Sequence, residues 1–443
     1  MSQFRFARIS LILAALGLNV APAMLGLVAP AQAADTPAAP AAPADAVRPE
    51  IFKLIDPAVI KTLMAAKNYP EVQTRIDQAA AMPNLTGYES FALNRMRIAV
   101  ASATNNAPMA KTALAAVIDS GRLPPADAGD FIQALANYYY NDKDYANALI
   151  WFKRYGKETG DNNKMRPYII RSYYFSNDFD NAKTELNTEV DGAIQAGKVP
   201  PIENLQLLAN TGAKTKDMTT YLKAMEKLVQ YYPNDDYWTD LLNRTQGKKT
   251  FNQALQVEAL RLEFVAVKKM ADEDYVNLAQ LDMIAGFPTE AKKVMDAGYA
   301  AGVLGTGGHA GEHKKLRDQA ARGAADDAKN IAGGEASASK SKDGVGLVNL
   351  GYAYVTMGNF DKGIDLMQKG IAKGNLKRPD DAVLRLGASQ AMAGKKDDAI
   401  KTLETVKGGE GQVDLAVYWT YWVNRPVGGA ATAPAVPAAP AAK

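Results

Sequence analysis

Apolar residues return at three- and four-residue spacing along most of this chain, which predicts amphipathic helices. Residues 130–140 and 145–155 show this pattern on either side of the polar turn Asn141-Asp142-Lys143-Asp144, and residues 166–175 and 179–186 repeat it. Runs of alternating β-branched residues bounded by hairpin-turn dipeptides are essentially missing. The chain is therefore expected to be all-α.

The helices come in pairs that return every 34 to 36 residues in the clearest part of the chain. An aromatic residue followed three positions later by a small one marks the best copies, Tyr145-x-x-Ala148, Phe179-x-x-Ala182, Phe251-x-x-Ala254 and Phe360-x-x-Gly363. The small position of each second helix falls at Val72, Ala113, Ala148, Ala182, Tyr221, Ala254, Ala291, Ala328, Gly363 and Ala399. A hairpin of this length cannot bury its apolar face alone, so the copies must stack.

These units resemble the tetratricopeptide repeat. One unit carries Leu350-Gly351, Tyr354, Gly358, Phe360, Gly363 and Met367 in the register of that family, and the next carries Leu386-Gly387, Gly394, Ala399 and Leu403. The resemblance implies an α-solenoid of antiparallel helix-turn-helix repeats that form a right-handed superhelix. It also implies a non-catalytic protein that binds other proteins.

Residues 1–33 have the features of a secretory signal peptide. Arg5 and Arg8 precede the apolar stretch 9–28, and Ala31-Gln32-Ala33 is a small-x-small cleavage site. Export with cleavage would leave a protein without an integral membrane segment in an extracytoplasmic space, the periplasm of a Gram-negative-type envelope. A retained membrane anchor is the alternative, which polar and proline residues within the apolar stretch disfavour.

Composition narrows the possible chemistry. The chain has no cysteine, which excludes disulfides, thiolate catalysis and a lipid anchor on cysteine. Its formal net charge of +3 falls to +1 without the predicted signal peptide, because residues 1–33 hold Arg5 and Arg8 and no acidic residue. A near-neutral chain gives no reason to expect a nucleic-acid partner.

Ala and Pro dominate both flanks of the folded body. Residues 34–48 are predicted to be a disordered linker and residues 427–443 a disordered tail. Between them we expect N-terminal repeats at 49–301, a Gly- and Ala-rich degenerate repeat or hinge at 302–344, and C-terminal repeats with a capping helix at 345–426.

The capping helix is unusual because residues 413–423 are aromatic nearly all round. A terminal repeat ordinarily needs one polar face. Packing of this helix against the last repeat is one interpretation, and an exposed docking face is the other.

Two histidines, His309 and His313, are the weak candidates for metal ligands. They lie four residues apart, the spacing that places two imidazoles on one helical face, but Gly311 disfavours a helix and the sequence is not His-Glu-x-x-His. We therefore expect no metal and no cofactor. The glycines of residues 302–311 follow a helical segment rather than a strand, so they do not indicate a phosphate loop.

The candidate binding residues come from the first helices of two aromatic-rich repeats. The positions that line the concave groove in the resembling family map to Gln133, Asn137, Tyr140, Lys164, Arg171 and Tyr174. An amide, an arginine and tyrosines that converge could hold a peptide backbone or a terminal carboxylate. The alternatives are a solvated groove without a ligand and a groove filled by the chain itself.

These observations predict a periplasmic scaffold or adaptor without catalytic residues, whose partners are envelope proteins or peptide segments. Two other functions stay open at this point. A glycan or peptide hydrolase would need a cleft with paired carboxylates, one of them of raised pKa. A metal carrier would use His309 and His313.

Overall fold

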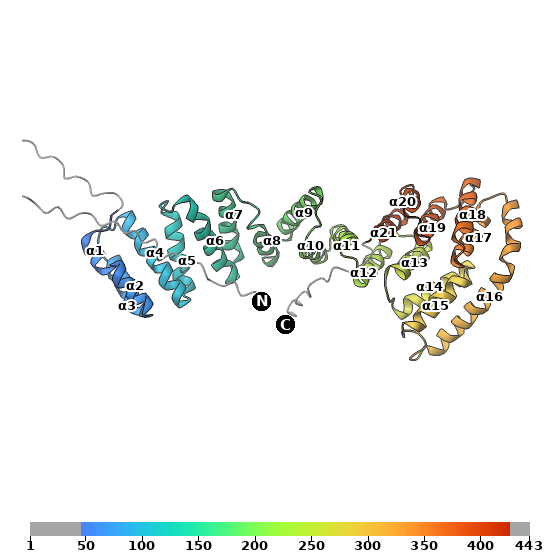
Figure 1. Cartoon of the computed structure of the whole chain (residues 1–443), viewed down its shortest axis with the longest axis horizontal. Coiled ribbons are helices and arrows are strands. Elements are labelled where there is room, and N and C mark those ends of the chain that lie inside the picture. Colours follow the sequence, from blue (N-terminus) through green and yellow to red (C-terminus); the bar gives the residue numbers. More distant parts are fainter. Residues whose placement is uncertain (1–45, 426–443) are drawn as a thin grey trace, which may run out of the picture. The chain divides into compact units, whose positions relative to one another are not determined.

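The regular elements of this protein are helices, as the apolar spacing predicted. The computed structural model describes residues 46–425 (Figure 1). The predicted signal peptide at 1–33, the linker up to residue 45 and the tail at 427–443 lie outside the described residues. No helix within 46–425 is long and apolar enough to cross a bilayer.

The chain divides into two units between Glu185 and Leu186, within α9 (Phe179–Gln195). Unit 1 contains the start of α9 and the following helices: α1 (Pro49–Leu54), α2 (Pro57–Ala65), α3 (Tyr69–Ala80), α4 (Gly87–Thr104), α5 (Ala107–Asp119), α6 (Pro125–Asn141), α7 (Tyr145–Thr159) and α8 (Arg166–Phe175). Both units are α-solenoids built of helical hairpins.

Unit 2 contains the rest of α9 and twelve α-helices with one short 3-10 helix among the described residues. These are α10 (Ile202–Thr215), α11 (Met218–Tyr231), α12 (Asp235–Gln246), η2 (Gln253–Leu255), α13 (Gln256–Ala266), α14 (Asp272–Ala285), α15 (Pro288–Ala300), α16 (Ala310–Lys340), α17 (Val345–Thr356), α18 (Phe360–Lys373), α19 (Pro379–Met392), α20 (Lys396–Leu403) and α21 (Gln412–Asn424).

In unit 1 each helix from α3 to α8 packs on the one before it in the chain. The hairpin of α6 and α7 shows how the sequence directs this. Asp144 caps α7 by accepting a hydrogen bond from the backbone N–H of Asn147. Ala148 and Phe152 on α7 are fully buried with Leu135 of α6. The small residue lets the two helices approach, and the large ones fill the space between layers.

The need for small residues where two helices cross is greatest between α17 and α18. A Cβ atom added to Gly351 would lie 2.6 Å from the carbonyl oxygen of Gly363, a distance that real Cβ atoms essentially never show. The two backbones therefore touch where the repeat pattern placed small residues.

Two of the predicted small positions are wrong. Ala254 and Ala328 are exposed, and neither lies at a helix crossing. Ala254 belongs to the short η2 and not to an α-helix. The aromatic residue of that copy, Phe251, is buried against Gly411, which precedes the last helix of the chain. It is thus covered by a distant segment rather than by its own hairpin.

Residues 302–344 contain one long helix. α16 runs without interruption from Ala310 to Lys340 and packs on α14, α15 and α17. Its glycines include Gly323, where an added Cβ would lie 2.7 Å from the side chain of Pro288 at the start of α15. A small residue is needed there for close packing. The division between the two units lies in α9, outside this segment.

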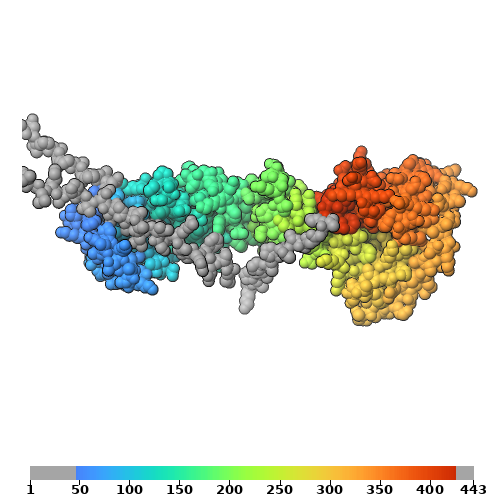
Figure 2. Space-filling model, viewed as in Figure 1, coloured from blue at the N-terminus to red at the C-terminus, as the bar shows by residue number. Residues whose placement is uncertain are grey.

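Unit 2 departs from a simple stack, in which each hairpin touches only its neighbours. The last helix, α21, packs on α19 and α20 but also on α11 and α13 (Figure 1). Tyr418 shares a hydrogen bond with Thr245 of α12, and Trp422 donates one to the carbonyl of Val265 in α13. In Figure 2 the red surface of the C-terminal helices accordingly meets the yellow-green surface of α12 and α13.

The aromatic C-terminal helix is thus mostly buried by this double packing. Tyr418 and Trp419 are 0% and 1% exposed. Val413 and Val417 remain exposed on its outer side. Of the two interpretations of residues 413–423, packing against the body of the protein accounts for the large aromatic side chains.

Candidate functional site

Three of the predicted binding residues lie on one stripe of α6. Gln133, Asn137 and Tyr140 follow each other at four- and three-residue spacing, so they share a helical face. The opposite stripe of the helix is buried through Phe131 and Leu135. All three predicted residues are half-buried. Within residues 46–425 the side chains of Gln133 and Asn137 have no hydrogen-bond partner.

Two more predicted residues, Arg171 and Tyr174, share a face of α8 at three-residue spacing. Arg171 is exposed, and no carboxylate of the described chain pairs with it. The rings of Tyr140 and Tyr168 lie 5.8 Å apart and join α6 to α8. Burial raises the pKa of Tyr140, and the positive charge of Arg171 opposes that rise. Arg171 therefore lies close enough to Tyr140 for its charge to affect the ionisation of that tyrosine.

The sixth predicted residue, Lys164, is not shown to join the others. It precedes α8 in the connection from α7, and its Nζ lies 5.2 Å from the ring centroid of Tyr155 on α7. We call the remaining set the α6–α8 face. Its members are Gln133, Asn137, Tyr140, Arg171 and Tyr174.

The α6–α8 face continues into a chain of aromatic rings at the ends of these helices. Tyr140 contacts Tyr145 at 5.6 Å, Tyr145 stacks on Phe175 at 5.5 Å, Phe175 meets Tyr174 at 5.7 Å, and Tyr174 meets Phe179 at 5.6 Å, all between ring centroids. We call these five residues the aromatic ladder. Phe175 is 51% exposed, although it is a large apolar side chain.

His309 and His313, the weak candidates for metal ligands, differ in exposure and in hydrogen bonding. His313 is buried, and its Nδ1 accepts a hydrogen bond from the backbone N–H of Gly305. His309 is exposed, with its Nδ1 3.2 Å from Glu312. The two ring centroids are 6.3 Å apart. No group of three or more metal-ligating side chains occurs among the residues that the structure describes.

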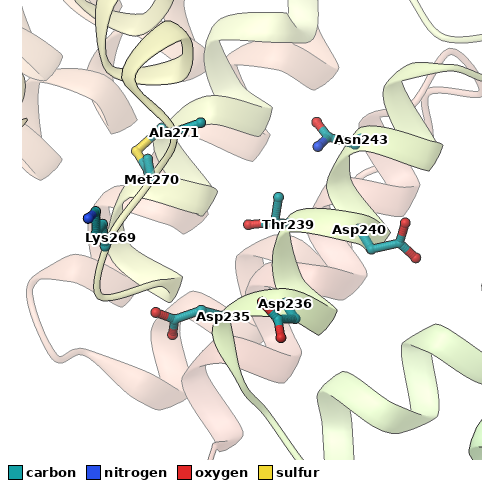
Figure 3. Close-up of a pocket in the computed structure, with 8 residues that line it drawn as sticks. All are labelled: Asp235, Asp236, Thr239, Asp240, Asn243, Lys269, Met270 and Ala271. Atoms are coloured by element: carbon teal, nitrogen blue, oxygen red, sulfur yellow. The ribbon is translucent and has the colours of Figure 1, made fainter. Parts of the chain in front are cut away.

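A small open pocket of about 400 Å³ lies between α12 and residues 269–271 (Figure 3). Three of its lining residues are acidic, Asp235, Asp236 and Asp240. Asp235 accepts a hydrogen bond from the backbone N–H of Lys268, and Asp240 accepts one from Tyr221. Figure 3 shows Asp240 pointing away from the 269–271 segment. Two of the three carboxylates thus hold the fold together.

Unit 2 also contains neighbouring carboxyl groups, but they lie in its interior. Arg261 binds Asp282 at 2.8 Å, Glu290 at 2.9 Å and Glu258 at 2.9 Å. Arg385 also binds Glu258, at 2.6 Å. With Tyr352, whose hydroxyl donates to Glu290, these residues form what we call the ion cluster.

Burial controls the ionisation of the ion cluster. It raises the pKa of Asp282 to about 9, helped by the charge of Glu290 and opposed by Arg261. For Glu258, burial also acts upward, but Arg385 and Arg261 outweigh it and hold the pKa below its ordinary value. Asp282 is 0% exposed and Glu258 2%. The contacts of the ion cluster join α13, α14, α15, α17 and α19.

Sequence reasoning missed two features of these sites. Phe175 belonged to a recognised aromatic run, but its exposure depends on how α8 ends beside α7. The ion cluster was invisible because Glu258 and Arg385 lie 127 residues apart in the chain. Three-residue spacing of Glu258 and Arg261 on one helix was the only local signal.

Comparison with known proteins supports the repeat assignment. Residues 381–407, which cover most of α19 and α20, match the tetratricopeptide repeat family. This confirms the resemblance that the spacing of small and large residues indicated. A search of curated proteins found no match.

Solved structures with helical repeats are similar at low identity. The TPR2AB domain of yeast Sti1 in a complex with pHSP90 is 14% identical, with 68% of this chain and 99% of that chain covered and a TM-score of 0.23. Yeast Tom70 is 11% identical, with 84% and 95% covered and a TM-score of 0.21. Naa15/Naa10 bound to HypK-THB is 12% identical, with 80% and 63% covered and a TM-score of 0.26. The partners of those proteins say nothing at this similarity about the partners of this chain.

Proposed function

We propose that this chain is a scaffold of tetratricopeptide-like repeats that binds peptide segments of other proteins on the α6–α8 face. The observation that supports this most is the pairing of unused polar groups with aromatic rings. Asn137 and Arg171 lack partners within the described chain, and Tyr140 and Tyr174 lie on the same helical stripes. An amide and a guanidinium can bind peptide carbonyls and carboxylates, and the rings supply apolar contact.

The proposed setting is the periplasm, in assembly or upkeep of the cell envelope. The signal-like residues 1–33 support export, and the absence of cysteine is compatible with an oxidising compartment. No catalytic role is part of the proposal. Asp282, the carboxyl group of raised pKa in the ion cluster, is buried, and two acidic residues of the open pocket are engaged in hydrogen bonds.

Site-specific photo-crosslinking in cells tests this proposal. A photoreactive residue at position 140 or 174 should capture partner proteins, and the double variant Asn137→Ala, Arg171→Ala should reduce that capture at least about tenfold if both polar groups bind the ligand. The same probe at Ile284, which is 83% exposed on α14 of unit 2, provides the control. Equal capture from positions 140 and 284, or capture that ignores the double variant, would contradict the proposal. Fractionation of the cells tests the compartment separately.

A further inference from the structure

A half-buried carboxyl group lies where α21 packs on the middle of unit 2. Glu226 of α11 accepts a hydrogen bond at 3.4 Å from the hydroxyl of Tyr418 on α21, and that hydroxyl shares a second one at 3.0 Å with Thr245 of α12. Tyr418 and Thr245 are both 0% exposed. Within residues 46–425 no lysine or arginine forms an ion pair with Glu226. We call this contact of Tyr418 with α11 and α12 the C-terminal closure.

A second carboxyl group and a lysine lie at the same closure. Lys248, just after α12, binds Asp414 of α21 at 2.8 Å, and the two side chains are 29% and 31% exposed. The negative charge of Asp414 also acts on Glu226. Neighbouring carboxylates repel each other, so each favours the protonated form of the other. Because Lys248 already pairs with Asp414, it compensates this repulsion only in part.

The surroundings of Glu226 favour its neutral form. Burial raises the pKa of Glu226, and the charge of Asp414 raises it further. Lys248, the hydrogen bond from Tyr418 and Lys227 oppose the rise but do not cancel it. Asp414 and the ring of Tyr418 that covers the carboxyl group both belong to α21. Separation of α21 from α11 would therefore remove the charge of Asp414 and part of the burial, and Glu226 would release its proton more easily.

Other ionisable groups near α11 have less effect on Glu226. Those on its neighbouring helices are Glu203 and Lys214 of α10, and Asp235, Asp236, Asp240 and Arg244 of α12. Glu203 acts on Tyr232 at the far end of α11, and Asp240 and Arg244 bind each other and act on Tyr221. On α21, Tyr421 feels the charge of Glu226, and burial and that charge raise its pKa to about 12, so it is neutral near pH 7. The charges that act most on Glu226 are thus those at the closure.

The hydroxyl groups at the closure fit both forms of Glu226. With the carboxylate, Tyr418 donates to Glu226 and the Thr245 hydroxyl can donate to Tyr418. With the neutral acid, the carboxyl O–H can donate to Tyr418 and Tyr418 to Thr245, because each hydroxyl is both donor and acceptor. Protonation therefore changes the charge at the closure without breaking its hydrogen bonds.

We propose that Glu226 is a pH-sensitive switch that makes the C-terminal closure tight in acid and weaker as the pH rises. The switch goes beyond the proposed function, because the α6–α8 face belongs to unit 1 and the closure lies entirely within unit 2.

The sign follows from the direction of the pKa change. Near and below the ordinary pKa of 4.5, Glu226 is protonated whether α21 is closed or open. At higher pH the open form loses its proton first, so the closed form must hold a proton that the open form does not. The closure therefore loses stability as the pH rises through this range, and its stability stays lowered above the pKa of the closed form.

A thiol placed at the closure tests the proposal, because the chain has no cysteine of its own. Thr245→Cys puts one beneath Tyr418, and its rate of reaction with a dithiodipyridine, relative to that in the unfolded chain, measures how often the closure opens. Ser389→Cys, also at a 0% exposed position but on α19, measures opening elsewhere in unit 2. From pH 4.5 to pH 8 the protection at position 245 should fall at least about threefold more than at position 389.

Amide hydrogen exchange of the chain without introduced thiols provides a second measurement, in case Thr245→Cys itself opens the closure. After correction for the intrinsic effect of pH, the protection of amides in α12 and α21 should fall over the same pH range by more than that in α17 and α18.

Variants assign the effect to Glu226. Glu226→Gln keeps the shape of the side chain but cannot ionise, so the excess loss of protection between pH 4.5 and pH 8 should vanish. Asp414→Asn, which removes the neighbouring negative charge, should reduce that loss. Glu410→Gln is the matched control, since it changes a 59% exposed carboxyl group in the segment before α21, and the pH response should remain.

Three results would overturn the proposal. The first is an equal change of protection at positions 245 and 389, or in the amides of all four helices, which would indicate a response of the whole of unit 2. The second is a pH response that survives Glu226→Gln. The third is protection at the closure that rises or stays constant with pH.

Discussion

At Glu263 the fold keeps a carboxyl group protonated close to neutral pH. The side chain is 0% exposed on α13, and the Thr239 hydroxyl donates to its Oε1 at 2.8 Å. Its Oε2 has no partner among the described residues. Burial raises the pKa of Glu263 from its ordinary 4.5 to about 7. The neutral acid is therefore the form that this site accommodates.

This raised pKa predicts a pH-dependent stability of unit 2. Below pH 4.5 Glu263 is protonated in both the folded and the unfolded chain and contributes nothing. Between 4.5 and 7 only the unfolded chain loses the proton, so stability falls as pH rises, and it stays lowered above 7. Glu263→Gln should therefore raise the free energy of unfolding by about 3 kcal/mol at pH 8 and change it little below pH 4.5. Thermal unfolding across this range checks it, with the exposed Glu404→Gln as a control that should follow the wild-type profile.

Arg261 is the residue on which the ion cluster depends. It is 3% exposed and binds carboxyl groups from three helices, α13, α14 and α15. Arg261→Ala should destabilise unit 2 by about 3 to 5 kcal/mol, because removing one partner leaves buried charge uncompensated. Arg244→Ala, which breaks a surface pair with Asp240, should cost no more than about 1 kcal/mol. Similar losses for both variants, measured by denaturant unfolding, would contradict this account of the cluster.

Among the helices, the crossing of α17 and α18 tolerates no added atom. Gly351→Ala places a Cβ 2.6 Å from the carbonyl oxygen of Gly363 and should destabilise unit 2 by about 1 to 3 kcal/mol. Gly333→Ala is the matched control inside α16, where an added Cβ meets nothing within 4 Å. It should stabilise by up to about 1 kcal/mol, since alanine favours a helix over glycine. The two melting temperatures should therefore move in opposite directions.

The attachment of α21 to the middle of unit 2 is also open to measurement. Tyr418 is fully buried and shares a hydrogen bond of 3.0 Å with Thr245 of α12. Tyr418→Ala should cost about 3 to 5 kcal/mol, and amide hydrogen exchange should accelerate in α11 and α12 as well as in α21. Val417→Ala, at a neighbouring position that is 37% exposed, should change stability by less than about 0.5 kcal/mol. Faster exchange confined to α21 would show that this helix does not secure the others.

The sequence predicted those hairpins whose two helices cover each other. Ala148 and Gly363 are both buried, as the repeat pattern predicted for its small positions. Their helices begin at the aromatic residue three positions earlier, directly after the predicted polar turn. The prediction failed at Phe251-x-x-Ala254 because Phe251 is covered by Gly411, 160 positions later in the printed sequence. No local pattern encodes that contact.

Only part of the candidate site could be predicted, because local patterns do not encode contacts between distant segments. Helical spacing was enough to put Gln133, Asn137 and Tyr140 on one stripe of α6. It could not place Lys164, which lies in a connection and turns to Tyr155. Nor could it show that Phe175 would be left exposed, because that depends on packing between successive hairpins.

At the scale of the whole molecule, the contact of α21 with α11 and α13 affects how the protein is made. A stack of hairpins can fold from its first pair onward while synthesis continues. Unit 2 cannot be completed in this way, because α21 is its last helix and the α11 and α13 surfaces that it covers lie far earlier in the chain. Until the C-terminal segment emerges, Phe251 also lacks its contact with Gly411, and incompletely covered apolar surface attracts chaperones and proteases. Ribosome stalling or proteolytic clipping near the C-terminus would therefore harm this protein far more than its small loss of mass suggests.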